Sequence, residues 1–413
     1  MTAVTAAPVA PSERIQVLDI LRAFALFGIL VMNMPGFYGT WWTTTRAEDI
    51  WTSWYDRTAL FIMSSFFDGK FNSLFSFLFG IEFSIQLARL KQRSSSPIAV
   101  YLRRLVVLFA FGAAHAILLW SGDVLHVYAV LGLFLMAMRN APDKLLLILV
   151  LGVLLTTTAM STVDVLSHTS SDVSEARKTI SRMEQLLNSA YGEGSYAEVV
   201  AARTEELRET YSSGDGFGFY LDVFVTMLLG FVVGRRGYLS NLEGSLPLIR
   251  RLQRWTMAVG LFSALLFGVG RLFTVPFEPT MWDVVVSTAY AWQRPTLMLF
   301  YASTIVLLAR TGKWGRRLAR IAPAGRIPLT NYLAQSVVCT TVFYGYGLGF
   351  YGQCGPALGM LLALLLYSGQ IALSAWYLRR FQYGPAEWLW RGITYGQRPP
   401  FRRTEDQVRA AEA

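Results

Sequence analysis

The side chains best suited to chemistry in this sequence are a few polar residues set within long apolar runs. The run from Val17 to Phe37 carries Asp19, Arg22 and Asn33. A helix turns about 100° per residue, so Arg22 and Asn33 come round to nearly the same face, and Asp19 lies one turn before Arg22, close enough to pair with it. Unpaired polar groups cost several kcal/mol in hydrocarbon, which predicts that this helix lines a site. The Asp19–Arg22 pair is interpreted either as an ion pair that stabilises the helix end or as a binding site for an anionic group. A lone asparagine such as Asn33 is typical of a helix–helix hydrogen bond.

A second set of candidates comprises Glu82, His115 and Asp123. Glu82, in FLFGIEFSIQLAR, falls within an apolar run, where a carboxylate indicates a function unless it is protonated or paired with an arginine. His115, in FGAAHAILLW, lies deeper in a predicted spanning segment than His126, which stands two to three residues inside the next one. His115 is the best available general base, although a buried histidine is also typical of a structural hydrogen bond. Asp123 is expected to cap the helix that follows it, or else to orient His115 or to bind substrate.

A second polar helix is predicted within GRIPLTNYLAQSVVCTTVFYGYGLG. Asn331, Gln335 and Cys339 are four positions apart and share a face, with Tyr332 and Ser336 one step round. This face is expected to point into a helical bundle, either to form interhelical hydrogen bonds or to line a cavity. The glycine run that follows is not interpreted as a dinucleotide loop, because no strand precedes it.

The composition shows which kind of protein positions these side chains. Hydrophobic residues make up 54% of the 413 residues and charged residues only 15%, and apolar runs of about twenty residues recur along the chain. We therefore predict an all-α, polytopic transmembrane helical bundle whose partner is the lipid bilayer; the continuous runs argue against a β-barrel. The net charge of +10 arises from basic residues gathered in short loops and does not indicate nucleic acid. Two cysteines give no disulfide framework, and no His, Cys or Asp spacing indicates a metal site.

About ten membrane-spanning helices are predicted. They cover residues 17–37, 71–90, 105–120, 124–138, 145–161, 217–234, 255–273, 284–309, 328–346 and 358–378. Basic residues flank every second connection, which predicts that both termini are cytoplasmic. Residues 163–216 carry ten acidic and five basic residues and are expected to form short amphipathic helices outside the membrane, on the far side.

The chain is predicted to consist of three regions. Residues 1–16 are predicted to be a flexible tail, residues 17–380 the transmembrane bundle with 163–216 as a polar insertion, and residues 381–413 an interfacial helix and cytoplasmic tail. The last assignment rests on YGPAEWLWRGITYGQRPP, whose aromatic and basic residues suit a helix lying at a membrane surface.

Four blocks of the sequence carry a family resemblance. LDILRAFALFGILVMN, FNSLFSFLFGIEFSIQ, FGAAHAILLWSGDVLHVYAVLGL and the long block GRIPLTNYLAQSVVCTTVFYGYGLGFYGQ…WYLRRFQYGPAEWLWRGITYG resemble the YeiB-like family of bacterial inner-membrane proteins, which share the domain of unknown function 418. The resemblance covers nearly the whole chain. It implies a multi-pass protein of the bacterial cell inner membrane and supplies no reaction.

The run from Val17 to Phe37 is also similar to the first helix of membrane acyltransferases, of the acyltransferase-three and heparan glucosaminide acetyltransferase types. Those enzymes move an acyl group from cytoplasmic acyl-CoA to a sugar-like acceptor across the membrane. The resemblance implies that Asp19 and Arg22 are motif positions. In many of those enzymes a catalytic histidine stands eleven residues after the arginine, and here that position is Asn33, which cannot act as a base.

The leading hypothesis from the sequence is therefore an acyltransferase-like membrane protein with acyl-CoA as donor and a lipid or sugar-like envelope molecule as acceptor. Arg22 and Arg326 would hold anionic groups of the donor, His115 would act as base, and Asn33 or Gln335 would polarise a carbonyl. Glu82 is a third catalytic candidate. The alternative is a non-enzymatic small-molecule transporter or lipid-binding protein, in which Glu82 and the Asn331 face line the path; a scaffold that uses the acidic loop is a further alternative.

Overall fold

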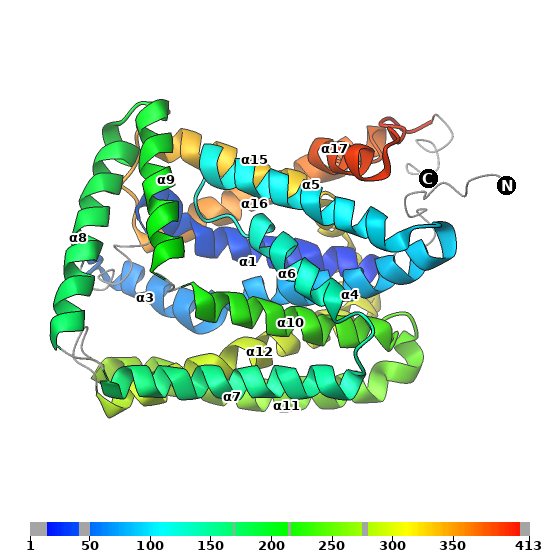
Figure 1. Ribbon diagram of the computed structural model, residues 1–413, viewed down its shortest axis with the longest axis horizontal. Helices are drawn as coiled ribbons and strands as arrows, with labels where there is room; N and C mark the ends of the chain where they lie inside the picture. Colours follow the sequence, from blue (N-terminus) through cyan, green and yellow to red (C-terminus); the bar gives the residue numbers. More distant parts are fainter. Residues whose placement is uncertain (1–14, 41–49, 168–169, 214–215, 275–279, 405–413) are drawn as a thin grey trace.

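The computed structural model describes residues 15–40, 50–167, 170–213, 216–274 and 280–404, and these residues fold into an assembly of helices (Figure 1). The helices that matter below are α1 (Gln16–Tyr38), α3 (Trp54–Ile62), α4 (Lys70–Arg93), α5 (Pro97–Leu118), α6 (Leu125–Ala137), α7 (Asp143–Ser167), α8 (Ser170–Glu193), α9 (Tyr196–Ser212), α10 (Phe217–Arg235), α11 (Leu242–Gly270), α12 (Met281–Ala309), α13 (Gly312–Ala319), α14 (Ala322–Arg326), α15 (Pro328–Phe343), α16 (Pro356–Arg380) and α17 (Pro385–Tyr395).

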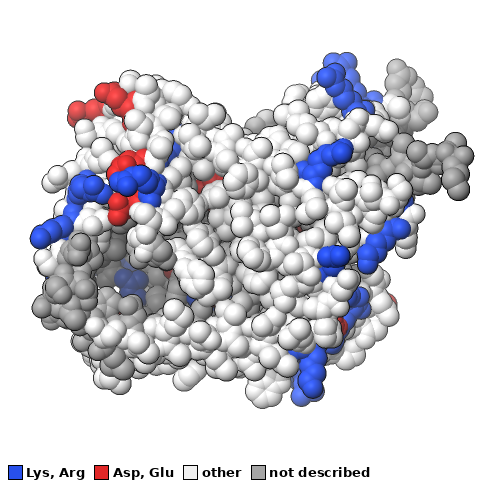
Figure 2. Space-filling model, viewed as in Figure 1, with Lys and Arg blue, Asp and Glu red and all other residues white. Residues whose placement is uncertain are grey.

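The long helices lie side by side, and the bundle has two different ends (Figure 1). Helices α8 and α9 stand across one end, which we call the α8–α9 end. The start of α1 and helix α17 lie at the opposite one, which we call the terminal end. On the face shown in Figure 2, basic side chains are spread along the terminal end, and near α8 and α9 both basic side chains and most of the acidic side chains in view are found.

Seven of the described helical segments are long and apolar enough to cross a bilayer. They are α1, the stretch Trp54–Arg93, α5, Asp143–Met160 of α7, α10, α11 and α16. The prediction of a multi-pass helical membrane protein is therefore confirmed in its coarse form, while the count of ten spans and the side of the termini stay predictions.

The other three predicted spans are also helices. With 13 and 16 residues, α6 and α15 are only about 20 and 24 Å long at 1.5 Å per residue, below the roughly 30 Å of a hydrocarbon core. Helix α12 is long enough, but it carries Gln293 and Arg294 in its middle. Gln293 is fully buried, and Arg294 forms an ion pair with Asp222 of α10, so these polar groups lie inside the protein.

Helix α1 lies at the centre of the bundle, and most of its residues are buried, from Val17 to Tyr38. Helix α14 packs directly on its first turns: a Cβ at Gly325 would lie 1.8 Å from the carbonyl oxygen of Asp19. Helices α4 and α10 also approach closely, because a Cβ at Gly80 or Gly230 would lie 2.0 Å from a carbonyl oxygen of the other helix. These contacts fix the helices that carry Asp19, Arg22 and Glu82.

Several predicted boundaries were wrong. Helix α5 begins at Pro97 rather than at 105, and α11 begins at Leu242 rather than at 255, because arginines along these helices lie at positions that remain partly or fully exposed. The polar insertion is not a set of short helices: α8 has 24 residues and α9 has 17. The two form a hairpin, and α9 begins at a capping box between Ser195 and Glu198.

Candidate functional site

A cavity of about 200 Å³ lies at the terminal end, between α1, α4, α5, α6, α15 and α17. Its lining combines charged and apolar side chains, and we call it the arginine cavity. The charged residues are Arg22, Arg89, Arg104, Arg326 and Arg391, with Asp19, Glu82 and Glu387. The apolar lining includes Leu26, Ile29, Phe75, Leu108, Leu125 and Tyr128. Five arginines against three carboxylates leave the charged lining net positive.

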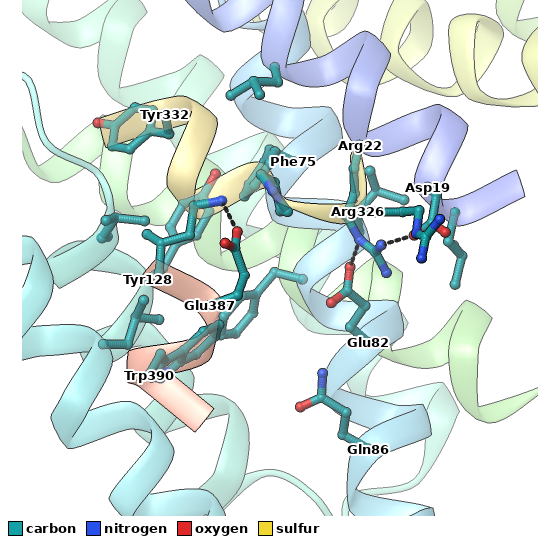
Figure 3. Close-up of a pocket in the computed structure, with 18 of the residues that line it drawn as sticks. Asp19, Arg22, Phe75, Glu82, Gln86, Tyr128, Arg326, Tyr332, Glu387 and Trp390 are labelled. Atoms are coloured by element: carbon teal, nitrogen blue, oxygen red, sulfur yellow. Dashed lines mark hydrogen bonds and ion pairs between the residues drawn. The ribbon is translucent and has the colours of Figure 1, made fainter. Parts of the chain in front are cut away.

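Arg22 links two elements at the wall of this cavity (Figure 3). Its guanidinium donates to Asp19, three residues earlier on α1, and to Glu82 of α4. Both pairs are partly buried, with the Arg22 side chain 18% exposed. The predicted Asp19–Arg22 pair is thus present. Glu82 is paired with an arginine, which is the non-functional interpretation of this carboxylate.

Helix α17 forms another wall of the cavity through Glu387, Trp390 and Arg391. The Glu387 carboxylate accepts hydrogen bonds from the backbone N–H groups of Leu329 (2.7 Å) and Thr330 (3.1 Å), which are free of helical partners at the start of α15. Burial raises the pKa of Glu387, although these bonds act in the opposite direction. The carboxylate therefore joins α17 to the first turn of α15.

Arg104 and Trp390 join α17 to α5. The Arg104 guanidinium lies 3.8 Å from the centroid of the Trp390 ring, and the indole Nε1 donates to the Arg104 carbonyl oxygen at 3.1 Å. A cation over an aromatic face is an attractive arrangement. The predicted interfacial helix thus takes part in the cavity wall.

His115 lies behind the far wall of the arginine cavity. The wall is formed there by Tyr332, whose ring centroid is 5.0 Å from that of His115. The Tyr332 hydroxyl donates to the carbonyl oxygen of Gly122 at 3.4 Å. Tyr332 therefore stands between the cavity and the histidine.

His115 is held at both ring nitrogens. Its Nδ1 lies 2.9 Å from Asp123 Oδ1, and its Nε2 lies 2.8 Å from Ser336 Oγ. An ionised Asp123 accepts a hydrogen bond from Nδ1–H, so Nε2 carries the lone pair and accepts a hydrogen bond from the serine hydroxyl. Asp123 also caps α6, as predicted, because its Oδ2 accepts from the backbone N–H of His126 at 3.0 Å. This order of serine, histidine and aspartate can move a proton from a hydroxyl to an imidazole.

A second pocket of about 350 Å³ lies toward the α8–α9 end, and we call it the α9 pocket. Its polar lining consists of Asn33, Asp68, Asn72, Ser121, Asp123, Glu206, Thr210, Tyr211 and Tyr220, with no lysine or arginine among the described residues of the lining. Val124 borders both this pocket and the arginine cavity. The His115–Asp123 pair therefore lies between two pockets of opposite charge character.

Nine of the eleven predicted site residues fall into three groups around the two pockets. Asp19, Arg22, Glu82, Arg326 and Tyr332 line the arginine cavity. Asn33 and Asp123 line the α9 pocket, and His115 with Ser336 lies between the two.

Asn331 and Gln335 line neither of these pockets. Their amides bond across to α16, with Asn331 Nδ2 at 3.0 Å from Ser374 Oγ and Gln335 Nε2 at 2.8 Å from Gln370 Oε1. They make the interhelical hydrogen bonds that were the alternative interpretation of this face. Of the two residues predicted as alternatives for polarising a carbonyl, Asn33 lines the α9 pocket and Gln335 lines neither pocket.

Several cavity residues carried no clear signal in the sequence. In the sequence, Arg104 is one of the basic residues that flank a connection, Arg391 is one of the basic residues of the predicted interfacial helix, and nothing distinguishes Tyr128. A signal was present at Glu387, an acid in the first turn of a helix otherwise rich in tryptophan and arginine. Its partner, the start of α15, could not be found from spacing, because 57 and 58 residues separate the bonded groups.

Comparison with known proteins places the chain in a family. A family model described as "Protein of unknown function (DUF418)" matches residues 233–397. The chain is 33% identical over 406 residues to the uncharacterized protein YxaH of Bacillus subtilis, an alignment that covers 94% of this chain and 96% of the relative. It is 28% identical over 421 residues to the uncharacterized protein YeiB of Escherichia coli, covering 92% and 96%. The chain therefore belongs to the YeiB-like family of proteins with the domain of unknown function 418.

Proposed function

We propose that this protein is a transmembrane acyltransferase, with an acyl thioester donor in the arginine cavity and a hydroxyl-bearing acceptor in the α9 pocket. One observation carries the proposal: a cavity with five arginines and an apolar interior is separated from a second, acidic pocket by a histidine–aspartate pair. The similarity of α1 to acyltransferase helices supports the same reaction from the sequence alone.

The proposal places the terminal end in the cytoplasm and the protein in the bacterial inner membrane. The connections at this end carry Arg235, Arg236, Arg310, Lys313, Arg316 and Arg317. Basic residues in short loops favour the cytoplasmic side. With this orientation the arginine cavity lies on the side where acyl-CoA is made available, and the α9 pocket lies on the far side.

The donor would bind through two kinds of contact. The phosphate groups of acyl-CoA match the guanidinium groups of Arg326 and Arg391, since arginine recognises phosphate through charge-assisted hydrogen bonds. The acyl chain matches the apolar residues deeper in the cavity, among them Leu26 and Leu108. Tyr332 closes the far end and must turn aside for the thioester to approach His115.

The chemistry would be direct acyl transfer with His115 as general base. In the resting structure His115 Nε2 accepts from Ser336, and the acceptor hydroxyl would take over this hydrogen bond. The hydroxyl oxygen attacks the thioester carbonyl, its proton passes to Nε2, and the thiolate that leaves takes this proton to become the free thiol. Asp123 keeps Nδ1 protonated and stabilises the imidazolium that forms in between.

The first test measures binding of acetyl-CoA to the purified full-length protein in nanodiscs by titration calorimetry. Arg326→Gln and Arg391→Gln should each weaken binding by about tenfold or more, the usual effect of losing a hydrogen bond to a charged group. Lys313→Gln, an exposed basic residue of the same end, is the matched control and should bind as the wild type does. Equal affinities in all four proteins would reject the arginine cavity as the donor site.

The second test follows radiolabelled acetyl groups from acetyl-CoA into envelope material of inverted membrane vesicles. His115→Ala should abolish the transfer while leaving acetyl-CoA binding intact, because His115 does not line the arginine cavity. Full transfer by His115→Ala would rule out its role as base.

The alternative function is lipid binding or transport, favoured by the position of Glu82. Its carboxylate lines the arginine cavity and is 25% exposed although it pairs with Arg22. An anionic phospholipid also presents phosphate beside an acyl chain. Binding of phosphatidylglycerol but not of acetyl-CoA, with proton-coupled uptake lost in Glu82→Gln, would favour this alternative.

A further inference from the structure

Asp123 is shared by two histidines. Its Oδ1 lies 2.9 Å from His115 Nδ1, and its Oδ2 lies 2.6 Å from His126 Nδ1. The carboxylate side chain has no exposed surface. Two imidazoles thus bind one buried carboxylate, each at a different oxygen.

The two imidazoles have different surroundings. The His115 side chain is 1% exposed and lies between Tyr332 and Ser336. The His126 side chain is 13% exposed, and its Nε2 is hydrogen-bonded to the hydroxyl of Tyr211 on α9. Tyr211 is half exposed and lines the α9 pocket. Solvent at the α8–α9 end therefore reaches His126 more easily than His115.

The charge of the carboxylate can stabilise only one imidazolium fully. If His126 binds a proton, its positive charge neutralises Asp123, and a second positive charge at His115 is then disfavoured. If His126 is neutral, Nδ1 donates to Asp123, Nε2 accepts from Tyr211, and the negative charge remains available to His115. The state of His126 thus changes how readily His115 accepts a proton.

We propose that His126 is a positioning residue, which sets the strength of His115 as a base through their shared Asp123. This inference rests on the proposed function, in which His115 is the base. Protonation of His126 from the α8–α9 side weakens the base, and hydrogen bonding by Tyr211 holds His126 in its neutral, active form.

Other titratable groups face this cluster from several elements. Tyr332 of α15 contacts His115, and Tyr220 of α10 stacks beside Tyr211. Glu206 of α9 and Asp68, just before α4, line the same pocket as Asp123. The test therefore needs variants at His126 itself. It also needs a variant at Tyr211 on α9, with a control at another tyrosine of α9.

The first experiment measures the pH profile of acetyl transfer from acetyl-CoA in inverted membrane vesicles made permeable to protons, so that the α8–α9 side, which faces the lumen, has the same pH as the medium. The wild-type rate should fall as the pH is lowered, with a first step that depends on proton binding at His126. His126→Gln and His126→Asn keep an amide N–H for Asp123 but cannot bind a proton, so each should lose the first step. A purely structural role for His126 would lower the rate at every pH without changing the shape of the profile.

Tyr211→Phe removes the hydrogen bond that favours neutral His126, and it keeps the proposal testable if the His126 variants do not fold. It should move the first step to higher pH, by roughly half to one pH unit. Tyr196→Phe is the matched control, because Tyr196 lies on α9 but bonds the carbonyl oxygen of Leu118. Profiles of wild type, His126→Gln and Tyr211→Phe that superimpose would overturn the proposal.

A second measurement does not depend on activity. Hydrogen–deuterium exchange at the imidazole carbon between the two nitrogens, followed by mass spectrometry in nanodiscs, reports protonation of each histidine. In His126→Gln the pH midpoint for exchange at His115 should rise by roughly one unit, because no second cation competes for Asp123. An unchanged midpoint would reject the coupling. A shifted midpoint in a protein that transfers no acyl group would retain the coupling and reject the proposed function.

Discussion

Glu206 shows how one buried carboxyl group makes the α8–α9 hairpin sensitive to pH. It is 5% exposed, and its carboxylate accepts a hydrogen bond from the Tyr191 hydroxyl at 2.8 Å. Burial raises the pKa of Glu206 above the ordinary value for glutamate. The folded hairpin therefore keeps a proton that the unfolded chain releases, and this contribution to stability is present at low pH and is lost as the pH rises through the raised pKa.

The direction of this pH effect on stability gives a prediction for Glu206→Gln. In the wild type, amide hydrogen exchange in α8 and α9 should become faster, relative to the intrinsic rate, as the pH rises above the ordinary pKa of glutamate. The glutamine side chain of the variant stays uncharged and can still accept from Tyr191, so the variant should lose this pH dependence. Glu205→Gln, at a partly exposed neighbouring position on the same helix, is the control and should behave as the wild type does over this range. The same pH dependence in Glu206→Gln would show that another group is responsible.

At the residue scale the sequence predicted local pairs but not distant ones. The Asp19–Arg22 pair follows from a spacing of three in one helix, and the cap at Asp123 follows from its place before α6. The bond between Arg22 and Glu82 joins residues 60 positions apart. It exists only because α1 and α4 pack together at one depth, which no single-helix pattern specifies.

At the scale of elements, the packing of α4 on α10 depends on small residues. A Cβ at Gly230 would lie 2.0 Å from the carbonyl oxygen of Phe77 on α4, too close for the backbones to keep their spacing. Gly230→Ala should therefore lower the free energy of unfolding by about 1–3 kcal/mol, the usual cost of overpacking. Thermal unfolding of the full-length protein in detergent measures this change.

Gly218 supplies a matched control within α10. A Cβ at this position meets nothing within 4 Å, so Gly218→Ala should be neutral or stabilise the helix by up to about 1 kcal/mol. Equal melting temperatures for Gly230→Ala and Gly218→Ala would contradict a close contact between α4 and α10.

The positions of the elements were easier to predict than their relation to the membrane. Each predicted spanning segment overlaps a helix, because apolar runs favour helices in a bilayer, although several boundaries differ. Asp222 on α10 pairs with Arg294 and so allows an arginine within α12. The sequence alone could not predict this pairing. It also could not show that α17 joins the cavity wall, since the bonds of Glu387 and Trp390 reach α15 and α5 across long separations.

At the scale of the whole molecule, two pockets of different charge are set on either side of one histidine. Transfer across the membrane requires that they face opposite compartments, with the arginine cavity toward the cytoplasm. The positive-inside rule supports this orientation, and the basic side chains of the terminal end agree with it (Figure 2). The orientation is testable without any knowledge of substrate.

Two single-cysteine variants, one at each end of the bundle, test this orientation. Ala197→Cys places a thiol on an exposed position of α9, and Lys313→Cys places one on an exposed position of α13. The native Cys339 and Cys354 are each 2% exposed, so the parent protein should give a low background. In cells whose outer membrane has been made permeable, a maleimide that cannot cross the inner membrane should label Ala197→Cys at once. It should label Lys313→Cys only after the inner membrane is disrupted, and the reverse pattern would put the arginine cavity on the wrong side for cytoplasmic acyl-CoA.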